Sequence, residues 1–451
     1  MVPSFGFERR ALQESDRTMI RRIVVALGFA LVAFGASARA DDKLAFLIPT
    51  LYGPSGLVVD SEAVLPTGQT HSAHFNSAFQ AEFTQFNVAL ASQLTGLPIP
   101  TPASGFTYTL DPSLGLFTRS TKSFGPLLSD RADTVGRHKL SVGVNYQRFT
   151  FDKIEGLDLG AVPAVFTHDN PAPGGRDDVV TTSNAIDASV SQLTTYLNFG
   201  VTSWLDAAVA LPLVTTDLRV RSTATVQRIG TGANSAIHFF RDDNGGFGNS
   251  RSFESSGSAS GIGDVVLRLK ARAFSIGAMA VGIGVDNRLP TGDEMDLLGS
   301  GAWGVKPFLV VSGSSRSFTP HATVGYEWNG ESTLAGDPVL GTKEKLPRQL
   351  TYSGGVAVAV TGNLTLAADV IGRRILDARR LVPRTFEAID GRTSFPDISF
   401  VRGSENEISG AVGFKFNPKG RLLIDANVLF ALDNHGLRDR VTPLVGLEYG
   451  F

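Results

Sequence analysis

Apolar and charged residues alternate one by one from Leu267 to Ala273. Valine, leucine and alanine stand at the odd positions from Val265 onward, whereas the even positions 268, 270 and 272 hold two arginines and a lysine. Successive side chains of a β-strand point to opposite faces, so this stretch predicts a strand with one apolar and one strongly charged face.

The same period of two recurs along most of the chain and predicts twelve strands. They cover residues 139–151, 184–200, 205–222, 262–274, 278–289, 302–311, 318–328, 349–360, 364–374, 406–416, 422–432 and 441–451. An even number of antiparallel strands is typical of bacterial barrels made from one chain. The pattern therefore predicts an all-β fold, a transmembrane antiparallel β-barrel of about 12 strands over residues 138–451.

The connections between these strands alternate in length. Residues 201–204, 275–277, 312–317, 361–363 and 417–421 form short turns. Between them lie the longer stretches 152–183, 223–261, 290–301, 329–348, 375–405 and 433–440. Outer-membrane barrels have short turns on the periplasmic side and long loops on the outer side, and a soluble β-sandwich gives no reason for this strict alternation.

Aromatic residues stand where the strands would cross the two membrane surfaces. Trp204 lies at a short turn, whereas Trp303 and Trp328 lie at the long-loop ends of neighbouring strands. Two belts of aromatic residues are typical of membrane barrels.

The last strand carries a second signal for the outer membrane. Its alternating residues Val445, Leu447, Tyr449 and Phe451 end on a terminal aromatic side chain. This end resembles the strand by which outer-membrane barrels are delivered to the bacterial barrel assembly machinery. We therefore expect outer-membrane lipid and this machinery as partners.

Residues 1–40 have the features of a secretory signal peptide. Arg21 and Arg22 precede the uncharged run 23–34, and Ala38-Arg39-Ala40 provides a cleavage site after Ala40. A transmembrane anchor is the alternative, but the run is shorter than the roughly 20 residues required. Translation starts at Met1 or at Met19, and either start predicts export to the outer membrane.

Composition excludes several classes of function. The 451 residues include no cysteine, so disulfide scaffolds, thiolate nucleophiles and cysteine-ligated zinc are ruled out. The net charge of −2 and the pI of 6.4 argue against a nucleic-acid partner, which would require a basic surface.

Residues 41–137 precede the barrel and predict a plug-like or periplasmic segment. An amphipathic helix is expected near residues 71–94, and its apolar face is formed by Phe75, Phe79, Phe83, Phe86 and Leu90. Residues 105–118 are consistent with a hairpin. Because a twelve-stranded barrel has a narrow lumen, one helix would occlude it. The alternatives are a helix on the periplasmic rim, or two additional strands that would make fourteen.

Charged residues dominate the face that the alternation turns inward. The lumen-lining candidates are Asp264, Arg268, Lys270, Arg272, Asp286, Arg288, Lys306, His321, Asp369, Asp425 and Glu448. Charges in a lumen tune ion selectivity, and this is one interpretation of the set. The alternative is that acidic and basic side chains pair and hold the barrel and its plug together.

Catalytic and metal-binding patterns are weak. A lipase-like barrel would require a serine–histidine pair at the lipid face, whereas parity turns His321 inward. His71 and His74 lie at i and i+3 without a third ligand nearby. The acidic stretches 242–246 and 293–296 lack the spacing of a known calcium loop. We expect no enzymatic activity, no cofactor and no metal.

Several segments resemble the family named for the MetA pathway of phenol degradation, over about residues 70–375. They are Ser123-Phe124-Gly125-Pro126, Ala132-Asp133-Thr134-Val135-Gly136-Arg137, Gly261-Ile262-Gly263-Asp264, Leu289-Pro290-Thr291-Gly292-Asp293, Leu297-Leu298-Gly299-Ser300-Gly301 and Gly325-Tyr326-Glu327-Trp328-Asn329-Gly330. The family resembles transporters of hydrophobic compounds and, more distantly, the long-chain fatty-acid transporters. The resemblance implies uptake or efflux of small hydrophobic, including aromatic, solutes. A general porin or structural barrel is the alternative, and an outer-membrane enzyme is the third.

Overall fold

The computed structural model describes residues 43–53, 56–59, 91, 107–111, 116–119, 122–167, 178–229, 238–241, 244–315, 317–388 and 390–451. The predicted signal peptide lies outside these residues. So does the predicted helix near 71–94, apart from Ala91, together with its face of Phe75, Phe79, Phe83, Phe86 and Leu90.

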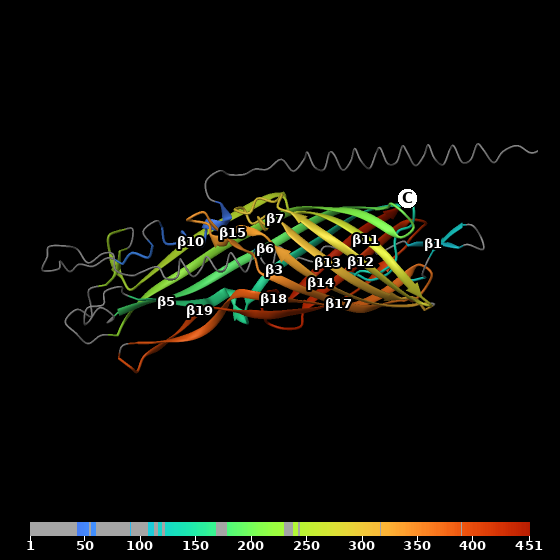
Figure 1. Cartoon of the computed structure of the whole chain (residues 1–451). Coiled ribbons are helices and arrows are strands. Elements are labelled where there is room, and N and C mark those ends of the chain that lie inside the picture. Colours follow the sequence, from blue (N-terminus) through green and yellow to red (C-terminus); the bar gives the residue numbers. More distant parts are fainter. Residues whose placement is uncertain are drawn as a thin grey trace, which may run out of the picture. The chain divides into compact units, whose positions relative to one another are not determined.

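Within the described residues, twelve antiparallel strands close into one barrel (Figure 1). They are β3 (Leu140–Ile154), β6 (Asp178–Gly200), β7 (Leu205–Arg228), β11 (Val265–Ile276), β12 (Met279–Leu289), β13 (Gly304–Gly313), β14 (Phe318–Asn329), β17 (Arg348–Ala359), β18 (Leu364–Glu387), β19 (Ser394–Phe416), β20 (Leu422–Ala431) and β22 (Val441–Gly450). Each strand pairs with the next of this set, and β22 pairs with β3 to close the ring. The predicted twelve-stranded barrel is confirmed.

Further elements do not belong to this ring of twelve strands. They are η1 (Leu44–Phe46), β1 (Tyr108–Asp111), β2 (Leu116–Arg119), β4 (Leu157–Asp158), η2 (Leu159–Ala161), β5 (Val162–Thr167), β8 (Phe240–Arg241), β9 (Phe247–Gly248), β10 (Ser250–Ile262), β15 (Glu331–Asp337), β16 (Thr342–Lys345) and β21 (Leu437–Asp439). Strands β1 and β2 pair with each other, as expected for a hairpin within 105–118, and do not join the barrel.

Strands β6, β7, β18 and β19 extend six or more residues beyond their predicted bounds, in each case at the end joined by a long connection. Strand β18 continues to Glu387 rather than 374, and β19 begins at Ser394 rather than 406. Strand β10 also occupies part of the stretch predicted as the connection 223–261. Beyond the lipid both faces of a sheet meet water, so outward positions become polar, as at Arg219 and Glu254. The alternation on which the prediction depends disappears there.

The barrel wall is apolar outside and polar inside. Large apolar side chains exposed on the outer surface include Leu267, Leu269, Ile283, Leu309, Val324, Leu366, Val412, Phe414, Val428, Val445 and Leu447. Buried polar side chains on the inner face include Gln147, Gln192, Asn198, Lys270, His321, Asp369, Lys415, Asn427 and Glu448. This polarity is the reverse of that of a soluble domain and is typical of a barrel that spans a membrane.

The three tryptophans mark the limits of the apolar band. Trp204, Trp303 and Trp328 are each about half exposed on the outer surface. Trp204 lies beside the turn between β6 and β7, and Trp303 and Trp328 lie at the opposite end of the barrel. No helix among the described residues has the length and apolar content to cross a membrane.

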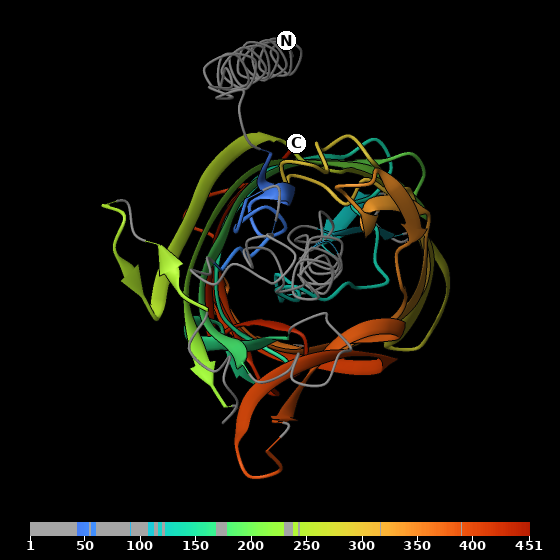
Figure 2. The ribbon, with the colours of Figure 1, turned by 90° about the vertical axis from the view of Figure 1, so that its left-hand side faces the viewer.

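Two segments that precede the first barrel strand lie against the inner side of the barrel (Figure 2). Residues 43–59 pack against β5, β6, β7 and β10 with the buried side chains of Leu44, Leu47, Ile48 and Leu57. Residues 122–137 cross the interior near the short turns and lead directly into β3. We call residues 43–59 the outer segment and residues 122–137 the inner segment.

Candidate functional site

The inner segment is held to the barrel wall through its backbone. One carboxylate oxygen of Asp369, on β18, accepts hydrogen bonds from the amides of Leu127 and Leu128 at 3.1 Å and of Ser129 at 3.4 Å. Its other oxygen lies 2.7 Å from Nε2 of His321, on β14. Neither side chain is exposed to solvent. A buried carboxylate requires such partners, and here most of them come from the inner segment.

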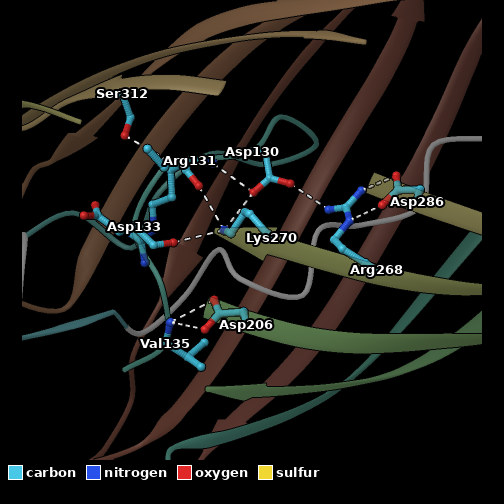
Figure 3. A network of polar contacts seen from close by, with 10 residues as sticks. Asp130, Arg131, Asp133, Val135, Asp206, Arg268, Lys270, Asp286 and Ser312 are labelled. Carbon is cyan, nitrogen blue, oxygen red and sulfur yellow. Dashed lines mark hydrogen bonds and ion pairs between the residues drawn. The ribbon is translucent and has the colours of Figure 1, made fainter. Parts of the chain in front are cut away.

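Charged groups tie the same segment to the opposite wall (Figure 3). The ammonium of Lys270 donates to the carbonyls of Arg131 at 2.9 Å and Asp133 at 3.0 Å. Asp130 lies between Lys270 at 3.2 Å and Arg268 at 2.6 Å. Because Lys270 is almost fully buried, removing its partners would leave a charge without compensation, which costs about 3–5 kcal/mol.

Further contacts fix the part of the segment next to the short turns. The amide of Ala132 donates to Ser312 Oγ at 3.1 Å, and the amide of Val135 donates to Asp206 at 3.1 Å. A Cβ added to Gly200 would lie 1.8 Å from the carbonyl oxygen of Gly136, so only glycine permits this approach of the chain to the wall. Residues 122–137 therefore form hydrogen bonds to the barrel strands β7, β11, β13 and β18.

A cavity of about 250 Å³ lies in the lumen beside the inner segment. Leu128, Ser129 and Asp130 contribute to its lining, so the segment forms one boundary of the cavity. Apolar side chains on the other walls are Phe149, Phe151, Ile371, Leu429 and Leu437. The rings of Phe149 and Phe151 are stacked, with centroids 6.1 Å apart.

Ion pairs line the remaining wall of the cavity. Arg268 forms two hydrogen bonds to Asp286, at 2.6 and 2.7 Å, and Lys306 lies 3.2 Å from the same carboxylate. The guanidinium of Arg268 also lies 5.0 Å from the ring centroid of Phe308. That ring fits against Gly284, where an added Cβ would come within 2.3 Å of it.

A second group of ion pairs faces the cavity from the far side. Arg373 donates to Glu407 at 2.7 Å, and Arg438 contacts Asp433 and lies 3.9 Å from Glu407. The cavity thus combines an apolar, partly aromatic surface with paired charges. It can accept an apolar molecule that carries a polar group. Within the described ranges, no group of three or more histidine, aspartate or glutamate side chains is arranged to hold a metal ion.

The structure divides the predicted lumen residues into three sets. Arg268, Asp286, Arg288 and Lys306 line the cavity. A second set lies near the inner segment or the short turns, and it consists of Lys270, Arg272, His321, Asp369, Asp425 and Glu448. Asp264 forms a set of its own, because it accepts hydrogen bonds from Gly292 and Ser300 and holds the connection between β12 and β13.

The predicted assembly strand is part of β22. Val445 and Leu447 are about half exposed on the outer surface, and the rings of Tyr449 and Phe451 lie 4.8 Å apart. The amide of Phe451 donates to the carbonyl of Leu140 at 2.7 Å, at the closure of the barrel.

Sequence reasoning missed four residues that the network depends on. Asp130 and Arg131 carry opposite charges in the inner segment, and both are buried. Asp206 anchors Val135, and Arg438 lines the cavity. Asp130 and Arg131 directly precede the segment Ala132–Arg137 on which the family resemblance depends, and this adjacency is the signal that was available.

Comparison with known proteins gives one family. The model of the family described as "Putative MetA-pathway of phenol degradation" matches residues 167–436, so the match begins and ends later than the predicted range. No curated protein matches the chain.

Several solved structures are similar to this chain at low identity. The COG4313 outer-membrane channel from Pseudomonas putida F1 has 12% identity and a TM-score of 0.42, over 72% of this chain and 99% of that one. A Pseudomonas aeruginosa FadL homologue has 12% identity and a TM-score of 0.29, over 77% and 94% of the two chains. The CymD monoaromatic hydrocarbon channel has 12% identity and a TM-score of 0.32, over 70% and 88%.

Proposed function

This chain belongs to the family of the MetA pathway of phenol degradation, and on that premise we propose that it is an outer-membrane channel for small hydrophobic compounds, aromatic ones among them. The observation that carries the proposal is the lumen cavity. It lies inside a barrel with an apolar outer surface, and Phe149 and Phe151 face it.

The apolar lining supports a hydrophobic solute rather than a sugar or an ion. Binding sites for small molecules are mostly apolar, with a few polar groups that fix orientation. Phe149, Phe151, Ile371 and Leu429 supply the apolar surface, and the ion pairs around Asp286 and Glu407 supply the polar one.

The inner segment supports a gated path rather than an open aqueous pore. It lies across the lumen beside the short turns and is tied to β7, β11, β13 and β18. We propose that it acts as a plug, as the sequence predicted for residues 41–137, and that a solute passes when it moves. A general diffusion porin would require this half of the lumen to be open.

Uptake measurements test the proposal. Cells with and without the protein are given labelled phenol, toluene or oleate, and the protein should raise the initial rate for at least one of them. Phe149→Ala combined with Phe151→Ala should lower that rate. Phe414→Ala, which removes a phenylalanine from the outer surface, should leave it unchanged.

Liposome swelling separates the channel from the general porin. The proposal expects no swelling with sugars in vesicles that contain the protein. Swelling with sugars, together with unchanged uptake of all three labelled compounds, would contradict it. The proposed role includes no catalytic step, cofactor or nucleic acid, and the proposed partners are outer-membrane lipid, the barrel assembly machinery and the transported solute.

A further inference from the structure

The outer and inner segments lie at opposite ends of the barrel. The outer segment is fixed at the end where the connections are long. Lys43 Nζ lies 2.8 Å from Asp293 and 2.6 Å from Asp296, and the amide of Ala45 donates to the carbonyl of Met295 at 2.9 Å. All three partners belong to the connection between β12 and β13.

Packing fixes the outer segment on the inner side of the wall. The hydroxyl of Tyr52 lies 2.9 Å from Ser222 Oγ and 3.2 Å from Asn184 Oδ1, and both residues are buried on the inner face of β7 and β6. The ring of Tyr52 meets Phe166 and Phe253 edge to face at 5.5 and 5.0 Å. Leu44 and Leu47 fill the space above Gly257 of β10.

The inner segment is fixed at the other end. Thr134 donates to the carbonyl of Ser203, in the turn between β6 and β7, and Phe124 donates to Thr365 at the start of β18.

From these two anchorages we infer that the outer segment presents Lys43 at the cell surface, whereas the inner segment lies at the periplasmic end of the same barrel. The inference rests on the proposed function, because long connections mark the outer side only in an outer-membrane barrel. Residue 43 would then lie on the opposite side of the membrane from the start of β3 and from Phe451. The residues around Lys43 would then face the medium outside the cell.

The absence of native cysteine allows a direct test in intact cells. Lys43→Cys and Thr50→Cys place single thiols at two exposed positions of the outer segment, and the second variant keeps the ion pairs of Lys43. Leu340→Cys marks the long connection between β14 and β17, where the side chain is 75% exposed. Lys419→Cys marks the exposed short turn between β19 and β20. A membrane-impermeant maleimide is added before or after permeabilisation of the outer membrane.

This placement of the outer segment predicts that the thiols at positions 43 and 50 react in intact cells to the same extent as the thiol at 340. The thiol at 419 should react only after permeabilisation. If positions 43 and 50 follow position 419, or react only in unfolded protein, the placement of Lys43 at the cell surface is wrong. If positions 340 and 419 do not differ, the outer-membrane orientation itself is wrong, and the proposed function fails instead.

Discussion

The two halves of the barrel interior carry the same kinds of side chain but use them differently. Near the short turns, Lys270 and Asp369 are buried against the inner segment and bind its backbone. Farther along the barrel, Arg268, Asp286 and Lys306 border a cavity and pair mainly with one another. Near the short turns, an inward charge therefore holds the inner segment in place. In the half that contains the cavity, an inward charge borders the space available to a solute. Four substitutions or conditions test this difference, from the largest expected effect to the smallest.

Replacement of Lys270 by methionine should cause the largest loss of stability. It leaves the carbonyls of Arg131 and Asp133 without their donor and removes one cation from Asp130. We expect a loss of about 3 kcal/mol, measured from the heat or urea dependence of the folded band on a gel. Lys306→Met, on β13, is the matched control, and it should cost less than about 1 kcal/mol because its side chain is 30% exposed. Equal losses for the two variants would remove the distinction between the halves.

Asp369→Ala should release the inner segment. The substitution leaves the amides of residues 127–129 without their acceptor, at a cost of about 1–3 kcal/mol. That free energy corresponds to an increase of about fivefold to 150-fold in the ratio of open to closed time, measured in single-channel recordings in planar bilayers. The same substitution at Asp187, whose side chain is 62% exposed outside the lumen, should leave conductance unchanged. Unchanged conductance in both variants would mean that the segment does not limit passage.

Lys306→Gln should alter ion selectivity with little effect on stability. Its ammonium borders the cavity and pairs with Asp286, which lies between Lys306 and Arg268. Removing one positive charge from the lumen should shift the reversal potential in a salt gradient toward cation preference. Lys419→Gln makes the same change in a short turn outside the lumen and should give no shift. A shift of equal size in both variants would locate selectivity outside the cavity.

The smallest expected effect is that of acidic pH on the anchorage of the outer segment. Partial burial works against ionisation, but the hydrogen bond from Lys43 holds the pKa of Asp293 below its ordinary value, near 3.9. Hydrogen bonds to Asp293 and Asp296 in turn raise the pKa of Lys43 above its ordinary value, near 10.4. Ionised Asp293 thus stabilises the outer segment above about pH 4, and this stabilisation is lost as pH falls through the lowered pKa of Asp293. Protonated Lys43 stabilises the same segment below about pH 10, and this stabilisation is lost as pH rises through the raised pKa of Lys43.

A spin label at position 50 reports this loss. Its mobility should stay constant across neutral pH and rise below about pH 4, by an amount that corresponds to at most about 1 kcal/mol for such an exposed pair. In Asp293→Asn the label should be more mobile at neutral pH, and the acid step should be smaller. An acid step of full size in that variant would assign the effect to another group.

The sequence was sufficient for the part of the fold that lipid imposes. Between the aromatic belts one face of each strand must be apolar, so alternation locates all twelve strands and turns Arg268, Lys270 and Asp369 to the correct face. Where the strands rise out of the lipid, this constraint ends, and the prediction ended too early on β18 and β19. The alternation of odd and even positions also cannot distinguish the buried surroundings of Lys270 from the cavity wall at Lys306. That difference depends on where a segment more than a hundred residues earlier in the chain crosses the lumen, and alternation along a strand contains no information about it.

The pairing of β22 with β3 joins the last barrel strand to the first, and this seam limits the order of events during folding. The inner segment leads directly into β3, so the strand that completes the ring is joined to the chain that lies in the lumen. Because Leu140 and Phe451 stand on the first and the last barrel strand, the hydrogen bond between them can form only when the two edges of the sheet meet.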